Sequence, residues 1–118
     1  MSERTVFTVK QGADHQVTLA SALGDTFTAT VVAELRRIPS LNSENPGTAV
    51  AATYADSTFA GDASYGPGWY LSLADTVTDD LTPGYYLVDA RITYTSPSSW
   101  VQLVDPWVIN IVEPATLP

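Results

Sequence analysis

The sequence contains no cysteine, one histidine and only five lysine and arginine residues in 118. Without cysteine, the chain has neither a disulfide framework nor a thiolate metal site. The one histidine, His15, follows a turn signal, and we interpret it as a surface or strand-edge residue because a zinc site would need carboxylates in close geometry. The formal net charge is −8, and only Arg36 and Arg37 are adjacent basic residues. This balance argues against nucleic-acid binding and against an anionic membrane surface.

Long hydrophobic runs are also missing. Residues 1–5 are not followed by the apolar segment of a signal peptide. No stretch approaches the roughly 20 apolar residues of a membrane-spanning helix. We therefore expect synthesis in the cytoplasm. The hydrophobic fraction of 45% is ordinary for a globular protein, and the length predicts one domain.

Two runs of alternating side chains give the strongest structural signal. The first follows the turn Pro83-Gly84 and extends to Tyr94, and the second extends from Phe27 to Arg36. Such a period of two places one row toward a core and the other toward solvent or a partner. A helix over residues 30–37 is the alternative for the second run, since Ala-Glu-Leu-Arg-Arg has good helix propensity. The expected core rows are Tyr86, Val88, Ala90, Ile92 and Tyr94, and Phe27, Ala29, Val31, Ala33 and Leu35.

Shorter strand-like runs fill most of the remaining chain. Gln11-Gly12-Ala13-Asp14 predicts a turn, residues 38–47 and 55–68 predict two loops, and residues 74–80 predict a polar connection with room for one helical turn. Asp105-Pro106 predicts a bulge or an edge crossing, because proline cannot donate to a ladder. The shorter expected strands are Val6–Lys10, Gln16–Ala20, Thr48–Tyr54, Trp69–Leu73, Trp100–Val104 and Trp107–Val112.

Frequent short strands without a convincing long helix predict an all-β fold. We expect an immunoglobulin-like antiparallel β-sandwich of about seven to eight strands over residues 1–112, followed by an extended tail at 113–118. The segment from Leu81 to Tyr86 is also typical of a tyrosine corner, in which a tyrosine hydroxyl bonds to backbone a few residues upstream. Tyr86 is the candidate, and an ordinary core tyrosine is the alternative.

The polar residues do not form a recognisable catalytic or ligand-binding motif. Aspartates gather in two expected loops, at 56 and 62 and at 75, 79 and 80, but their spacing fits no EF-hand. Gly66-Pro67-Gly68 lacks the Lys-Ser/Thr continuation of a phosphate-binding loop. No nucleophile-elbow pattern accompanies His15. We therefore expect no catalytic residue, no cofactor and no metal site.

The aromatic residues are the better candidates for function. Tryptophan and tyrosine serve as core residues, as protein-contact residues or as platforms for sugar rings, and all three interpretations remain open for these side chains. The tail at 113–118 is a natural arm for reaching a neighbour, and we expect deletion of residues 112–118 to weaken assembly without unfolding the domain. The candidate interface residues are Trp69, Tyr85, Trp100, Trp107, Val112, Pro114 and Leu117.

Several segments resemble small structural proteins of tailed phages. Val9-Lys10-Gln11-Gly12-Ala13-Asp14 is similar to their opening strand and Gly-Asp turn, and Leu71-Ser72-Leu73 with Leu81-Thr82-Pro83-Gly84-Tyr85-Tyr86-Leu87-Val88-Asp89 resembles a recurring Leu-Ser-Leu, then Leu-x-x-Gly-x-Tyr-x-x-Asp pattern. Residues 107–112 are similar to their closing strand. The family is the immunoglobulin-like domain at the N-terminus of baseplate upper proteins, together with stand-alone virion proteins of that type.

The resemblance implies a non-enzymatic virion component of the capsid surface, neck or baseplate. Its expected partners are further copies of itself and other virion proteins, without nucleic acid or membrane. The long predicted loops depart from the compact family pattern. A carbohydrate-binding module for a host surface glycan is the alternative function, and solvent-exposed coplanar tryptophans would favour it. An enzyme is the third hypothesis, and no constellation of acid, base and nucleophile supports it.

Overall fold

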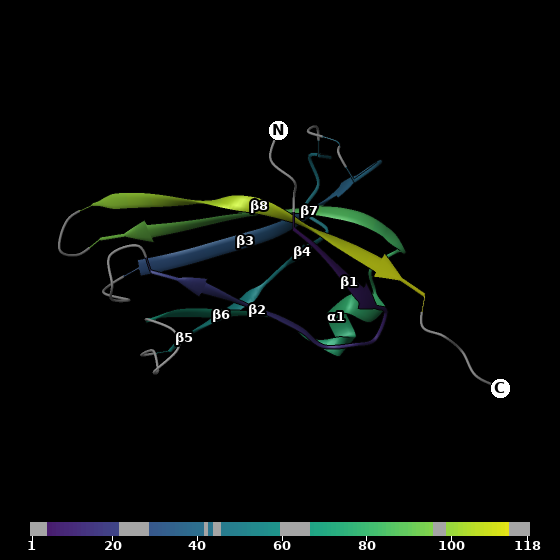
Figure 1. Cartoon of the computed structure of the whole chain (residues 1–118), viewed down its shortest axis with the longest axis horizontal. Coiled ribbons are helices and arrows are strands. Elements are labelled where there is room, and N and C mark those ends of the chain that lie inside the picture. The colour runs from purple at the N-terminus through teal and green to yellow at the C-terminus, as the bar shows by residue number, and fades with distance from the viewer. Residues whose placement is uncertain are drawn as a thin grey trace.

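The computed structural model describes residues 5–21, 29–41, 43, 46–59, 67–95 and 99–113. These residues form two β-sheets that pack face to face, with one short helix at the end of the smaller sheet (Figure 1). The larger sheet has the order β1 (Val6–Lys10), β8 (Trp100–Val112), β7 (Gly84–Tyr94), β3 (Ala29–Ile38) and β4 (Ala52–Thr53), and the smaller sheet has the order β2 (His15–Ala20), β6 (Gly68–Leu73) and β5 (Ala55–Phe59).

The predicted β-sandwich is therefore confirmed. If β2 to β8 are lettered B, C, C′, D, E, F and G, the sheets read C′-C-F-G and B-E-D, which is the strand arrangement of immunoglobulin-like domains. One described pair departs from the antiparallel prediction. Strand β1 runs parallel to β8, with Val6 beside Val108 and Lys10 beside Val112. This strand follows the outer edge of the larger sheet before the chain crosses to β2.

The two strongest alternating runs pair with each other in the centre of the larger sheet. Strand β3 lies antiparallel to β7, with Ala33 opposite Ala90. The helix considered for residues 30–37 is wrong, because alternate side chains on both strands pack against the smaller sheet. The residues of the expected core rows that the structure describes are buried or half-buried, namely Ala29, Val31, Ala33, Leu35, Tyr86, Val88, Ala90, Ile92 and Tyr94.

The last two expected strands form one long strand interrupted by a bulge. Trp107 lies opposite Val88 and Val104 lies opposite Ala90, so Asp105 and Pro106 together oppose one residue of β7. This confirms the bulge expected at Asp105-Pro106. Proline is tolerated here because the bulge interrupts the regular backbone hydrogen bonds between the strands, so the missing N–H of proline is not needed.

Other segments differ in detail from the sequence-based prediction. The loop expected at residues 55–68 is wrong at its start, where β5 pairs with β6, and Ile38 ends β3 rather than beginning a loop. The polar connection contains the expected helical turn, α1 (Asp75–Asp79). No helix in the described ranges is long and apolar enough to cross a membrane.

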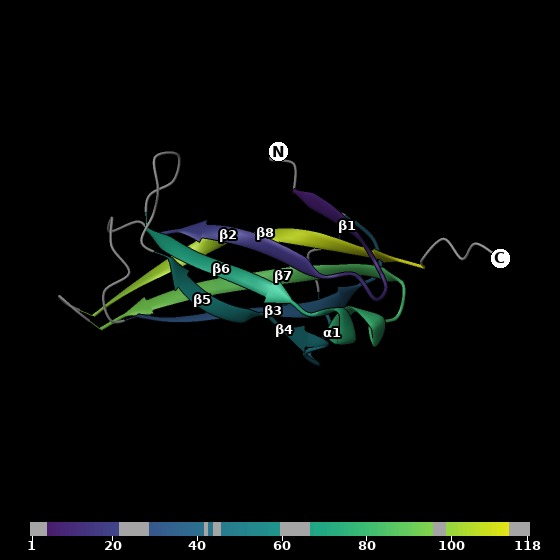
Figure 2. The same cartoon turned by 90° about the horizontal axis from the view of Figure 1, so that it is seen from below.

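Both sheets contribute to one hydrophobic core. Figure 2 shows the smaller sheet lying across the larger one, with β2 over the side that carries β8. The core combines aromatic rings with aliphatic side chains from alternate positions of each strand. Its buried members are Val9, Leu19, Val31, Ala33, Leu35, Tyr54, Trp69, Leu71, Leu73, Leu81, Tyr86, Val88, Ala90, Ile92, Tyr94, Trp107, Ile109 and Ile111.

Candidate functional site

Two of the three tryptophans belong to the core rather than to a docking surface. Trp69 on β6 is 1% exposed, and its ring meets Tyr94 edge to face at 6.2 Å between centroids. Trp107 on β8 is 6% exposed and donates its indole N–H to the Tyr54 hydroxyl at 3.3 Å. This burial corrects the prediction that Trp69 and Trp107 are interface residues, because neither side chain has much exposed surface for a partner.

The remaining candidate residues occupy different environments. Tyr85 is half-buried on the face of the larger sheet that points away from the core, and Val112 is half-buried at the end of β8 beside Lys10. The Val112 carbonyl accepts a hydrogen bond from the Gln11 N–H at 2.9 Å, so Val112 belongs to the fold as well as to the proposed arm. Pro114 and Leu117 lie outside the described residues.

Trp100 is the candidate that the structure leaves on the surface. Its side chain is 43% exposed at the first residue of β8, with its ring 5.4 Å from that of Tyr94. Two neighbours that sequence reasoning missed are still more exposed, Val101 at 47% and Leu103 at 78%. In the sequence, Val101 and Leu103 alternate with the residues of this strand that face inward. The outward-facing row that they form was not identified as a surface from the sequence.

Val101 and Leu103 lie on the outer face of the larger sheet, which we define as the face turned away from the smaller sheet. Leu103 is opposite Arg91 on β7, and Arg91 is opposite Val32 on β3. Val32 is also exposed, at 41%. Val101 and Leu103 thus form an exposed apolar pair on β8, and Arg91 on β7 separates this pair from Val32 on β3. Exposed apolar groups that gather in this way mark interaction surfaces.

The same part of β8 forms an open sheet edge. Strand β1 covers β8 only from Val108 to Val112, and among the described strands none pairs with Trp100–Val104 on the side away from β7. We call this side the β8 edge. On this side the backbone N–H and C=O groups of Val101 and Leu103 are not paired with any strand that the structure describes, and an unpaired strand edge is the usual route to strand addition.

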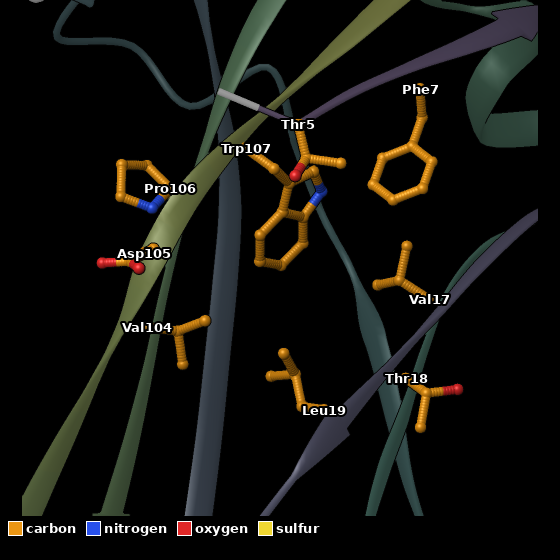
Figure 3. Close-up of a pocket in the computed structure, with 9 residues that line it drawn as sticks. All are labelled: Thr5, Phe7, Val17, Thr18, Leu19, Val104, Asp105, Pro106 and Trp107. Carbon is orange, nitrogen blue, oxygen red and sulfur yellow. The ribbon is translucent and has the colours of Figure 1, made fainter. Parts of the chain in front are cut away.

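A cavity of about 250 Å³ lies next to this edge, between the two sheets. In Figure 3, the Trp107 ring stands between Val104, Asp105 and Pro106 on one side and Phe7, Val17 and Thr18 on the other. Thr5 and Leu19 complete the lining. The lining combines apolar side chains with two threonines and the carboxylate of Asp105.

Aromatic rings connect the wall of this cavity to the interior. Phe7 meets His15 at 5.3 Å, and His15 meets Tyr54 at 5.9 Å. Burial lowers the pKa of His15 below its usual 6.5, and burial raises the pKa of Tyr54 despite the hydrogen bond from Trp107. The His15 Nε2 atom is buried, and no residue in the described part of the chain forms a hydrogen bond with it. His15 is thus a half-buried ring in an aromatic row at the first residue of β2, an edge strand of the smaller sheet, which agrees with the strand-edge interpretation rather than with a surface position.

The acidic residues do not gather around a common point in the described ranges. No group of three or more histidine, aspartate or glutamate residues there could hold a metal ion. Asp14 and Asp75 instead stabilise the start of α1, where the Asp14 side chain accepts a hydrogen bond from the Asp75 N–H at 2.8 Å.

No protein-family model matches the sequence, and no curated protein matches it.

Proposed function

We propose that this chain is a non-enzymatic structural protein of a tailed-phage particle that acts through protein–protein contacts. The single observation that carries the contact role is the exposed apolar pair Val101 and Leu103 beside the open β8 edge. Apolar side chains and unpaired strand backbone on one surface favour binding to protein. The phage assignment is supported by the sequence resemblance of residues 71–73 and 81–89, and the site within the particle is the capsid surface, neck or baseplate.

The acidity of the chain fits this role. A net charge of −8 keeps the free protein soluble before assembly and opposes contact with nucleic acid. Attachment then depends on a neutral surface, where the burial of apolar area outweighs the repulsion between charges. The exposed pair Val101 and Leu103 has this composition.

Quantitative mass spectrometry of purified phage particles tests the proposal. We expect the protein in a fixed ratio to the major capsid protein, retained through density-gradient purification. An abundant host protein measured in the same preparation is the control for contamination. Loss of the protein to the level of that control would contradict a structural role.

Carbohydrate binding is the second candidate, and the exposed ring of Trp100 is the observation that favours it. An exposed indole stacks on the apolar face of a sugar. Because Trp69 and Trp107 are buried, the platform of several tryptophans considered from the sequence is reduced to one ring. A glycan array compares the wild type with Trp100→Ala and with Tyr70→Ala, which removes an exposed ring from the smaller sheet. Glycan binding that only Trp100→Ala abolishes would favour this candidate.

A further inference from the structure

We propose that two copies of this chain associate edge to edge, with Trp100–Val104 of one β8 pairing antiparallel to the same segment of the second copy. The inference rests on the proposed function in one respect, since it takes the surface beside the β8 edge to be a protein-binding surface. It adds the identity of the partner, a second copy, and the strand register of the contact.

Some backbone N–H and C=O groups of the β8 edge point away from β7. Beyond the bulge, the Val108 N–H points away from β7 and donates to the Thr5 carbonyl at 2.9 Å. Backbone direction alternates along a strand, and the extra residue of the bulge reverses the phase of this alternation. Val101 and Leu103 therefore direct their N–H and C=O groups away from β7, into the position that β1 occupies farther along β8.

Charge limits the contact between two copies to a neutral part of the surface. Two molecules that each carry −8 repel one another, and they approach best where both surfaces are neutral. Residues 92–104 form the longest stretch of the sequence without a charged residue, and the β8 edge ends that stretch. Natural edge strands that avoid association carry lysine or proline. Here the first interruption is Asp105-Pro106 at the bulge, which limits pairing to the neutral segment.

The segment Trp100-Val101-Gln102-Leu103-Val104 is complementary to itself. An antiparallel pair with its two-fold axis at Gln102 places Val101 opposite Leu103 of the second copy on the outer face. On the inner face, Trp100 comes opposite the second copy's Val104. Each match joins apolar groups, and aromatic and β-branched cross-strand pairs stabilise antiparallel sheets. Asp105 comes opposite Ser99 in this register, so no carboxylate faces its own copy.

The side chain of Gln102 fits this geometry. It points toward the core of its own molecule, where its Oε1 accepts from the Tyr94 hydroxyl at 2.8 Å and its Nε2 donates to the Ala20 carbonyl at 3.4 Å. The two-fold axis consequently passes through a residue whose side chain is already held within its own sandwich.

Sedimentation velocity over a concentration series tests the contact. We expect the wild type to form a dimer and Leu103→Lys to weaken dimerisation by about tenfold or more, because the two-fold axis brings the new charge close to its own copy. Val32→Lys is the matched control, since it places the same charge on the outer face two strands from the β8 edge. Circular dichroism of each variant verifies that the fold is retained.

Three outcomes would overturn the proposal. They are a wild type that stays monomeric throughout the series, a Leu103→Lys variant that dimerises as well as the wild type, and a Val32→Lys variant that is weakened as much as Leu103→Lys.

The register is tested by cross-linking, for which the absence of native cysteine gives a clean background. Gln102→Cys places two thiols directly opposite each other across the axis, within the Cα separation of about 4.4–6.8 Å that a disulfide accepts. We expect rapid disulfide dimers for Gln102→Cys and slow ones for Leu103→Cys, which faces Val101. Equal rates would contradict the register. A negative result in these assays leaves the particle mass spectrometry unaffected, so the two proposals fail separately.

Discussion

The hydroxyl group of Tyr86 fixes the turn that leads into β7. It donates to the Thr82 carbonyl at 2.6 Å, which confirms the tyrosine corner expected from the sequence. The Arg37 guanidinium lies 5.5 Å from the centre of the Tyr86 ring and donates to the Pro83 carbonyl at 3.0 Å. One tyrosine and one arginine thus tie β3 to the turn before β7.

Tyr86→Phe is expected to lower the free energy of unfolding by about 1–2 kcal/mol, because it removes the hydroxyl and leaves the Thr82 carbonyl without that donor. Urea denaturation measures the change. Tyr85→Phe removes a hydroxyl from the opposite face of the same strand and is expected to change stability by no more than about 0.5 kcal/mol. Equal losses for the two variants would contradict a specific role for Tyr86.

His15 makes the stability of the domain depend on pH. The pKa of His15 in the folded protein lies below the unfolded value of 6.5, because burial disfavours the charged ring. Between the lowered pKa and 6.5, the unfolded chain binds more protons than the folded chain, so stability falls as the pH falls through this window. Well above pH 6.5 the ring is neutral in both states and the effect disappears.

His15→Gln is expected to remove this dependence. Thermal unfolding followed from about pH 7.5 to about pH 5 should show a steeper decline for the wild type than for the variant. Asp14, the neighbouring titratable group, is unchanged in both proteins, so the comparison isolates the imidazole. Parallel pH profiles would show that His15 contributes nothing to acid sensitivity.

At the scale of strands, Gly68 allows β2 and β6 to approach closely. Gly68 pairs with Ala20, and a methyl group added at Gly68 would collide with the Leu19 carbonyl oxygen and lie 3.1 Å from the Ala20 Cα. These neighbours are backbone atoms, which cannot rotate away as a side chain can. The close pairing at the start of β6 therefore requires glycine.

Gly68→Ala is expected to destabilise the domain by about 1–3 kcal/mol or more, because β2 must shift to relieve the overlap. Chemical denaturation measures the loss. Gly47→Ala is the control, since the nearest atom to its added methyl group would be the Arg37 carbonyl oxygen at 3.8 Å. A Gly68→Ala variant as stable as Gly47→Ala would contradict this expectation, because it would show that β2 can shift without any loss of stability.

At the scale of the whole molecule, net charge opposes the proposed dimer. Two copies together carry twice the charge of −8, and salt screens their repulsion. We expect the dissociation constant to fall as the ionic strength rises from low salt to about 0.15 M, where the screening length is about 8 Å. Sedimentation at several salt concentrations measures this trend. Dimers that dissociate as salt is added would indicate attractive ion pairs rather than neutral edges.

The sequence by itself determined the all-β class, both central strands, the bulge at Asp105-Pro106 and the tyrosine corner. Each of these depends on local chemistry, namely the period-two burial of a strand, the missing N–H of proline and the short distance from Tyr86 to the preceding turn. Neighbouring residues carry this information, so it can be read without knowing how the chain folds back on itself.

Only the tertiary structure decided which aromatic and apolar residues reach the surface. Trp69, Trp100 and Trp107 look alike as residue types, but Trp69 and Trp107 face the opposite sheet while Trp100 lies at the beginning of β8 beyond that cover. The parallel course of β1, which pairs with only five of the 13 residues of β8, likewise depends on partners distant in sequence. Burial and strand pairing are set by long-range contacts, and the candidate binding surface follows from them.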